Sequence, residues 1–129
     1  MSDERDVLAA FEGFYEAVCR DRDPQAALAL WADDDDVTLF GSDEVDAALG
    51  PVELGRHLEA IAAYPAEIVF AWGERRARIE AEVAWVAAQG TLSVGGDAVP
   101  YHAAGVFVRR QGRWLWHTHA GSTPTPQAS

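Results

Sequence analysis

Apolar residues recur every three or four positions in the first half of the chain, which is the spacing of helices that bury one face. The first such segment runs from Val7 to Cys19. A second, short helix is expected from Pro24 to about Trp31, with Asp23 as its N-cap. A third is expected to begin at Pro51 and to stop before the next proline, at position 65. The pattern therefore predicts three helices in this half.

After residue 65 the pattern changes to long segments rich in β-branched and aromatic residues, which are typical of strands. These segments are residues 67–79, 82–94, 99–110 and 113–121. The turn sequences GGD and QG separate the last three, and a short strand, Val37–Phe40, precedes them all. Helices followed by an antiparallel meander predict an α+β domain with its helices packed on one face of a sheet.

Length and composition suit a single domain. The chain has 129 residues, of which 49% are hydrophobic, and we expect residues 1–129 to form one domain with an ordered core at about 4–122 and a loose tail at 123–129. No apolar run approaches the length that a membrane span needs, so none is expected. The charged N-terminus and the single cysteine, Cys19, predict a cytoplasmic protein. A net charge of −11 repels phosphate groups, so neither a nucleic acid nor a membrane is expected as a partner.

The last strand segment contains two tryptophans and two histidines within six residues. Because side chains alternate along a strand, Trp114 and Trp116 are expected on one face and His117 and His119 on the other. Three interpretations of the histidines stay open. They are paired or exposed at a sheet edge or dimer interface, they line a pocket in which one is a general acid or base, or they bind a metal.

The metal interpretation lacks support in the sequence. A His-x-His pair needs a third ligand, and no Cys or His motif supplies one. The acidic run Asp33–Asp36 lacks the glycine and glutamate spacing of an EF-hand and is expected to be a solvated helix exit. No metal site and no cofactor are therefore predicted.

Other polar and aromatic residues are candidates for a pocket. His102 lies on a strand with two apolar faces and is either a hydrogen-bonded core residue or points into a cavity. Tyr15 lies in the apolar stripe of the first helix, as a core tyrosine or as a phenol that donates a hydrogen bond into a pocket. Trp31 and Phe40 would be the apolar walls of that pocket, and Ser42 could reach its mouth.

Several motifs together resemble the SnoaL-like branch of the nuclear transport factor 2-like superfamily. They are DDVTLFGS followed by GPVELGRH, the strand VAWVAAQGT, and the closing GRWLW with its later GS, and the resemblance covers about residues 7–124. It implies a cone-shaped roll in which a strongly curved, mainly antiparallel sheet wraps around the first helix, with a pocket at the wide end and dimers formed through the convex sheet face. Relatives include isomerases, cyclases and dehydratases as well as non-catalytic transport factors and association domains, so the fold leaves the activity open.

The ketosteroid isomerase pattern within this superfamily carries over only in part. Its oxyanion-donating tyrosine falls on Tyr15, whereas its general-base aspartate falls on Leu39. Because a leucine side chain cannot accept a proton, the mechanism of that isomerase is not expected here.

Two functions therefore stay open for a protein expected to bind a small apolar or semi-polar molecule. One is a cofactor-free isomerase, cyclase or dehydratase that uses general acid/base chemistry. The other is a non-catalytic homodimeric module for ligand binding or association. The catalytic candidates are His102, His117, His119 and Tyr15. The ligand-binding candidates are Trp31, Phe40, Ser42 and Trp85.

Overall fold

The helices of the protein gather at the N-terminal half of the chain. The computed structural model describes residues 2–42 and 47–124. The helical elements are α1 (Ser2–Tyr15), the π-helical turn η1 (Glu16–Arg20), α2 (Pro24–Leu28) and α3 (Gly50–Ala62). The start of α2 is as the sequence predicts, because the Asp23 carboxylate accepts a hydrogen bond from the Ala26 N–H and Pro24 occupies the first turn.

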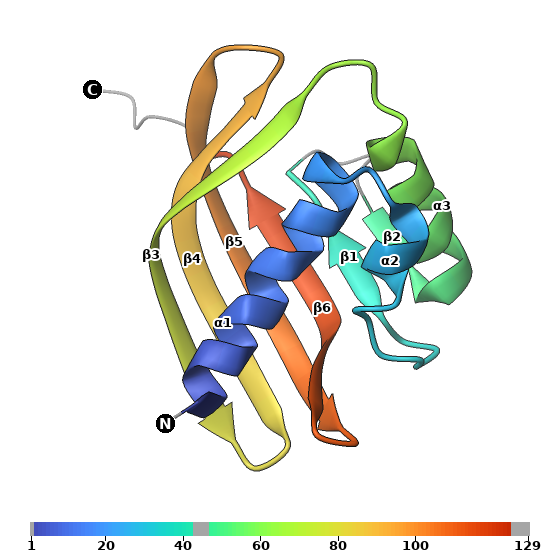
Figure 1. Cartoon of the computed structure of the whole chain (residues 1–129), viewed down its shortest axis with the longest axis vertical. Coiled ribbons are helices and arrows are strands. Elements are labelled where there is room, and N and C mark those ends of the chain that lie inside the picture. The colour runs from blue at the N-terminus through green and yellow to red at the C-terminus, as the bar shows by residue number, and fades with distance from the viewer. Residues whose placement is uncertain (1, 43–46, 125–129) are drawn as a thin grey trace.

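In the part of the chain that the structure describes, six strands form one curved, unclosed sheet (Figure 1). They are β1 (Thr38–Phe40), β2 (Ala47–Leu49), β3 (Ile68–Glu80), β4 (Val83–Val94), β5 (Ala98–Arg110) and β6 (Arg113–Ser122). Their order across the sheet is β2-β1-β6-β5-β4-β3, and all neighbours are antiparallel except β1 and β6, which are parallel. The predicted α+β class with N-terminal helices on a mainly antiparallel sheet is confirmed.

The core lies between α1 and the concave face of the sheet (Figure 1). Trp116 of β6 is fully buried there, and its indole ring stacks on Phe11 of α1 at a centroid distance of 5.4 Å. The indole N–H donates to the Ala10 carbonyl at 3.0 Å, so the ring's one polar atom is satisfied. Full burial of such a side chain contributes roughly 1.5–3 kcal/mol to folding. The aromatic contacts therefore fix α1 across the sheet.

The helix bounds differ from the predicted ones at two places. The first helix begins earlier, at Ser2, and its last turn is π-helical rather than α-helical. The second helix ends at Leu28, short of Trp31, because the chain there pairs with β6: the Ala32 N–H donates to the Trp116 carbonyl at 2.8 Å. Competition from a neighbouring strand for backbone hydrogen bonds is not visible in local sequence periodicity.

Strand β2 was not predicted, because it is three residues long and only its middle residue, Ala48, is buried. The strands expected from residue 67 onward agree with β3 to β6 to within one residue at each end. The expected tail at 123–129 lies mostly outside the described residues. Among the described helices, none has both the length and the apolar character required to cross a bilayer.

Candidate functional site

A cavity of about 640 Å³ opens beside the inner face of the sheet. Its walls come from the end of α1, from η1, from α3 and from all four long strands together with β1. The described lining contains no Asp, Glu, Lys or Arg, and its apolar members include Phe14, Phe70 and Leu92. Among its polar members are Tyr15, Ser42, His57, Tyr101 and His119. The site is therefore an apolar chamber with a few hydroxyl and imidazole groups.

Tyr15 and His119 form a buried hydrogen-bonded pair in this wall. The Tyr15 hydroxyl lies 2.7 Å from His119 Nε2, and the two residues are 6% and 4% exposed. The other ring nitrogen, His119 Nδ1, lies 2.9 Å from the carbonyl oxygen of Phe40. Because burying an unpaired polar group is costly, this double partnership explains how an imidazole is accommodated in the core.

Burial keeps both members of the pair uncharged at neutral pH. Desolvation lowers the pKa of His119 from 6.5 to about 4, against the opposing effect of its hydrogen bond to the Phe40 carbonyl. Desolvation likewise raises the pKa of Tyr15 well above its usual value near 10, and the neighbouring Tyr101 hydroxyl raises it further. At pH 7 the wall therefore presents a phenol and a neutral imidazole.

A β-bulge in β6 aims His119 inward. Val106 of β5 pairs with Thr118 and Phe107 pairs with Trp116, so that His117 is left without a partner position on β5. The extra residue reverses the alternation beyond it. His119 therefore lies on the inner face together with Trp116, and the expectation that His117 and His119 share a face is wrong.

The π-helical turn η1 directly follows Tyr15. A π turn widens the local backbone and is often found at functional sites. Here it carries Val18 and Cys19, which line the cavity next to Tyr15. Burial raises the pKa of the Cys19 thiol to about 12, so this cysteine stays protonated and is not an activated nucleophile.

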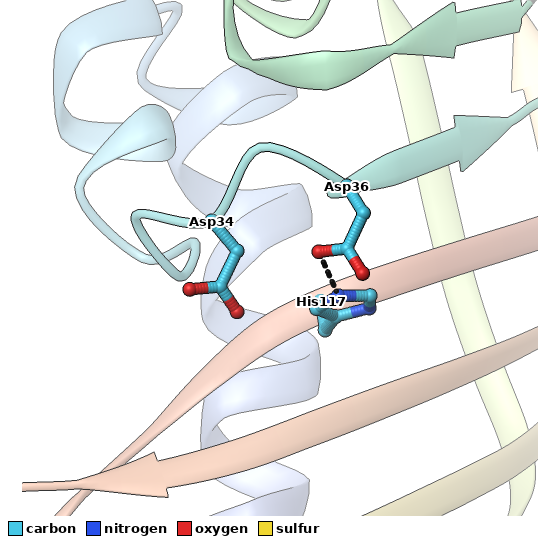
Figure 2. Close-up of side chains that lie close together, drawn as sticks. All are labelled: Asp34, Asp36 and His117. Atoms are coloured by element: carbon cyan, nitrogen blue, oxygen red, sulfur yellow. Dashed lines mark hydrogen bonds and ion pairs between the residues drawn. The ribbon is translucent and has the colours of Figure 1, made fainter.

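His117 lies outside the cavity, in a cluster with two aspartates (Figure 2). Its Nε2 lies 2.9 Å from Asp36 Oδ1, and potential ligand atoms of Asp34, Asp36 and His117 lie within 4.8 Å of one another. No pattern in the sequence signalled this approach of the acidic run to His117. Asp34 is, however, already bound through both oxygens by Arg110, at 2.6 and 2.9 Å. A cation at the cluster would have to displace this guanidinium.

The other predicted site residues are distributed unevenly around the cavity. Ser42 lines the cavity. Phe40 is 45% exposed and is not among the lining residues, but its carbonyl oxygen accepts the hydrogen bond from His119 Nδ1. Trp31 is buried in the core, where it stacks on Trp116 at 5.6 Å, and it does not line the cavity. Trp85 is 42% exposed and lies on the outer face of the sheet.

His102 also lies on the outer face, so it is not a pocket residue. On β5, Tyr101 and Ala103 are buried on either side of the exposed His102. Both faces of this strand are apolar in sequence, so alternation alone could not tell which face is inside. The inward position belongs to Tyr101, which was not among the predicted site residues.

A second, smaller cavity of about 420 Å³ adjoins the first between α1, η1 and β3. The two share Tyr15, Cys19, Ile68 and Phe70. The smaller one is lined by charged residues, among them Glu12 and Arg22, so its chemistry differs from that of the apolar chamber.

The sequence profile of the SnoaL-like domain family matches residues 7–126. The chain belongs to this family. No curated protein matches the SnoaL-like chain closely enough to assign an activity. Solved structures share its fold, and the descriptions of the following three differ from one another.

A candidate dehydratase of the NTF2-like family from Streptomyces avermitilis is 24% identical, with a TM-score of 0.84 over 97% of this chain and 98% of the other. An NTF2-like protein of unknown function from Pseudomonas putida KT2440 is 21% identical, with a TM-score of 0.80 over 95% and 87%. A ketosteroid isomerase-like protein from Erwinia carotovora atroseptica is 21% identical, with a TM-score of 0.70 over 96% and 98%. At these identities the similarity establishes the fold alone.

The position that the resemblance assigns to a general-base aspartate does face the cavity of this SnoaL-like domain. Leu39 is 3% exposed and lines the chamber. The wall at this point is therefore apolar, and any proton transfer in the chamber must use other groups. One group that was not among the predicted site residues is His57 of α3, which lines the same cavity. In the sequence, His57 lies in the third predicted helix, and nothing there distinguishes it from a surface histidine.

Proposed function

We propose that this SnoaL-like domain binds a small, uncharged, mainly apolar molecule in the 640 Å³ cavity. One observation carries the proposal: a chamber without Asp, Glu, Lys or Arg in its described lining contains a buried, neutral Tyr15–His119 pair. The volume falls within the range of small-molecule sites, and such sites combine apolar walls with a small number of placed polar groups.

The energetics of the fold support this proposal. Protein interiors are normally close-packed, and a cavity among apolar side chains forfeits packing contacts that would stabilise the core. The buried imidazole of His119 adds a desolvation cost that a leucine at that position would avoid. A cavity and a buried polar pair in the same place are both unfavourable for stability, which is the pattern expected of a binding site.

A second candidate function is cofactor-free isomerisation, cyclisation or dehydration in the same chamber. The observation that favours it is the imidazole of His57 in the cavity wall, in addition to the Tyr15–His119 pair. An imidazole can give or take a proton, whereas His119, with a pKa of about 4, is a weak base at neutral pH. In this version His57 exchanges the proton and Tyr15 and His119 orient the substrate.

We also propose that two copies pair through the outer face of the sheet. On this face Trp85 of β4 pairs in register with Val106 of β5, and both side chains are exposed, at 42% and 37%. The next register pair on the same face, Ala87 and Ala104, is small and apolar as well. An exposed apolar stripe across two neighbouring strands is suited to a symmetric partner.

The binding proposal is tested by calorimetry and thermal shift with naphthalene-sized probes. Binding at one hundred times the dissociation constant should stabilise the wild type by about 2.7 kcal/mol. Ala60→Phe places a ring in the cavity wall and should abolish binding. Ala9→Phe places the same ring on an exposed position of α1 away from the cavity, and should leave binding intact. Absence of binding by the whole panel to the wild type would refute the proposal.

A further inference from the structure

One backbone oxygen determines the direction of every hydrogen bond in the Tyr15–His119 pair. The Phe40 carbonyl has no hydrogen to give, so His119 Nδ1, at 2.9 Å, must be the donor. Burial lowers the pKa of His119 to about 4, so the ring is neutral and its Nε2 carries no hydrogen. Nε2 is therefore an acceptor, and the Tyr15 hydroxyl at 2.7 Å donates to it.

This direction decides what Tyr15 can offer to a bound molecule. A tyrosine hydroxyl has one hydrogen and two acceptor lone pairs. Its hydrogen is directed at His119, and Tyr15 is a lining residue of the cavity, so what its hydroxyl can offer a ligand there is the oxygen as an acceptor. One lone pair is enough for a ligand even where a neighbouring group uses the other.

We propose, on the basis of the proposed binding function, that the cavity selects apolar molecules bearing a neutral hydroxyl, such as phenols, enols or alcohols, over those with only a carbonyl or ether oxygen. A hydroxyl ligand donates to Tyr15 and leaves the Tyr15–His119 bond in place. The hydrogen bonds then run in one direction, from ligand to Tyr15, to His119 and to the Phe40 carbonyl, and bonds aligned in this way strengthen one another.

A carbonyl ligand cannot use the same site at equal cost. To donate to it, Tyr15 must turn its hydrogen away from His119 Nε2. That nitrogen is buried, and a buried acceptor without a donor is penalised. The role differs from that of the oxyanion-donating tyrosine which the family resemblance implied for Tyr15, because in this chain the hydrogen is already engaged.

The test is a matched set of four naphthalenes measured at pH 7 by calorimetry: 2-naphthol, 2-methoxynaphthalene, 2-acetylnaphthalene and naphthalene. Only the first can donate a hydrogen bond. We expect wild-type protein to bind 2-naphthol roughly five- to tenfold more tightly than each of the others, as one net hydrogen bond gives. The Tyr15→Phe variant should bind 2-naphthol only as tightly as it binds naphthalene, and its affinity for naphthalene should differ little from that of the wild type.

A second variant keeps the test decisive if Tyr15→Phe fails to fold. His119→Leu removes the acceptor and releases the Tyr15 hydrogen toward the cavity. In this variant 2-acetylnaphthalene should gain severalfold over naphthalene, so that the preference for 2-naphthol over the ketone shrinks or reverses. Tyr64→Phe removes another hydroxyl at the same cavity and should retain the 2-naphthol preference.

The outcomes separate the two proposals. Absence of binding by all four probes would refute the binding function itself. Equal affinities for the four probes, tighter binding of the ketone by the wild type, or loss of the preference in Tyr64→Phe instead of Tyr15→Phe would overturn the donor selectivity and leave the binding function standing. An unchanged ranking in His119→Leu would also overturn it, because the direction of the Tyr15 hydrogen would then not matter.

Discussion

The hydroxyl of Tyr15 and Nε2 of His119 are 2.7 Å apart although 104 positions separate the two residues in the chain. The contact joins the C-terminal end of α1 to β6, and the carbonyl of Phe40 extends it to β1. Three segments that are distant in sequence therefore meet at one buried polar point. Both the stability of the fold and the chemistry of the cavity depend on how this point is satisfied.

Loss of the Tyr15 hydroxyl should destabilise the fold. Tyr15→Phe keeps the ring but leaves His119 Nε2 buried without a donor, and we expect a decrease of about 1–3 kcal/mol in the free energy of unfolding in urea. The matched variant is Tyr64→Phe, in which the side chain is 46% exposed, and a change within about 0.5 kcal/mol is expected there. Equal effects of the two substitutions would contradict a special role for the Tyr15–His119 bond.

The depressed pKa of His119 predicts a specific loss of stability in acid. In the folded state its pKa is about 4, below the value of 6.5 expected when the chain is unfolded. As the pH falls, the unfolded state therefore binds a proton before the folded state does. The stability that the folded state gains from keeping His119 neutral is complete above pH 6.5 and decreases progressively toward pH 4. A difference of this size between the two pKa values corresponds to about 3 kcal/mol in the free energy of unfolding.

The measurement compares wild-type protein with His119→Leu, which has no titratable group at this position. Urea unfolding at a series of pH values should show the stability of the wild type falling relative to the variant by about 3 kcal/mol between the two pKa values. Parallel profiles for the two proteins would show that His119 titrates in the same range whether the chain is folded or unfolded.

The architecture was predictable from the sequence because it rests on local patterns. The helix stripe placed Tyr15 on the buried face of α1, and alternation correctly placed Trp114 and Trp116 on one buried face of β6. The motifs that carried the family resemblance lie along nearly the whole chain, and the family profile matches the same region. These signals need no knowledge of the neighbouring strand.

The site was only partly predictable, because tertiary pairing determines it. The bulge at His117 arises between β5 and β6, and it turns His119 inward against the alternation read from β6 alone. On β5 both faces are apolar, so the sequence could not show that Tyr101 faces inward and His102 outward. His57 reaches the cavity because of the way α3 packs, and the apolar pattern of this helix does not reveal that packing.

Two glycine substitutions should have opposite effects on stability. A side chain at Gly90 of β4 would overlap the carbonyl oxygen of Ala71 and lie 2.9 Å from Trp72 Cα, next to the bulge in β3. Because the clash is with backbone, Gly90→Ala should destabilise the fold by about 1–3 kcal/mol. Gly13 lies within α1, and a methyl group added there would meet open space. Gly13→Ala should therefore stabilise the fold by about 0.5–1 kcal/mol. Thermal and urea unfolding of both variants provide the check, and a stable Gly90→Ala protein would contradict the close approach of β3 and β4.

Pairing through the outer sheet face predicts that a charge placed there separates the copies. In a symmetric dimer each substituted residue occurs twice across the interface, so Val106→Glu introduces two desolvated carboxylates beside Trp85 and its symmetry mate. We expect sedimentation velocity to show a dimer for the wild type and a monomer for Val106→Glu, with unchanged circular dichroism. Val52→Glu makes the same change on α3, at a side chain that is 65% exposed and remote from this face, and should remain dimeric. A monomeric wild type at micromolar concentration, or a dimer that survives Val106→Glu, would show that this apolar stripe is not the interface, because two carboxylates cannot be buried there without a compensating cation.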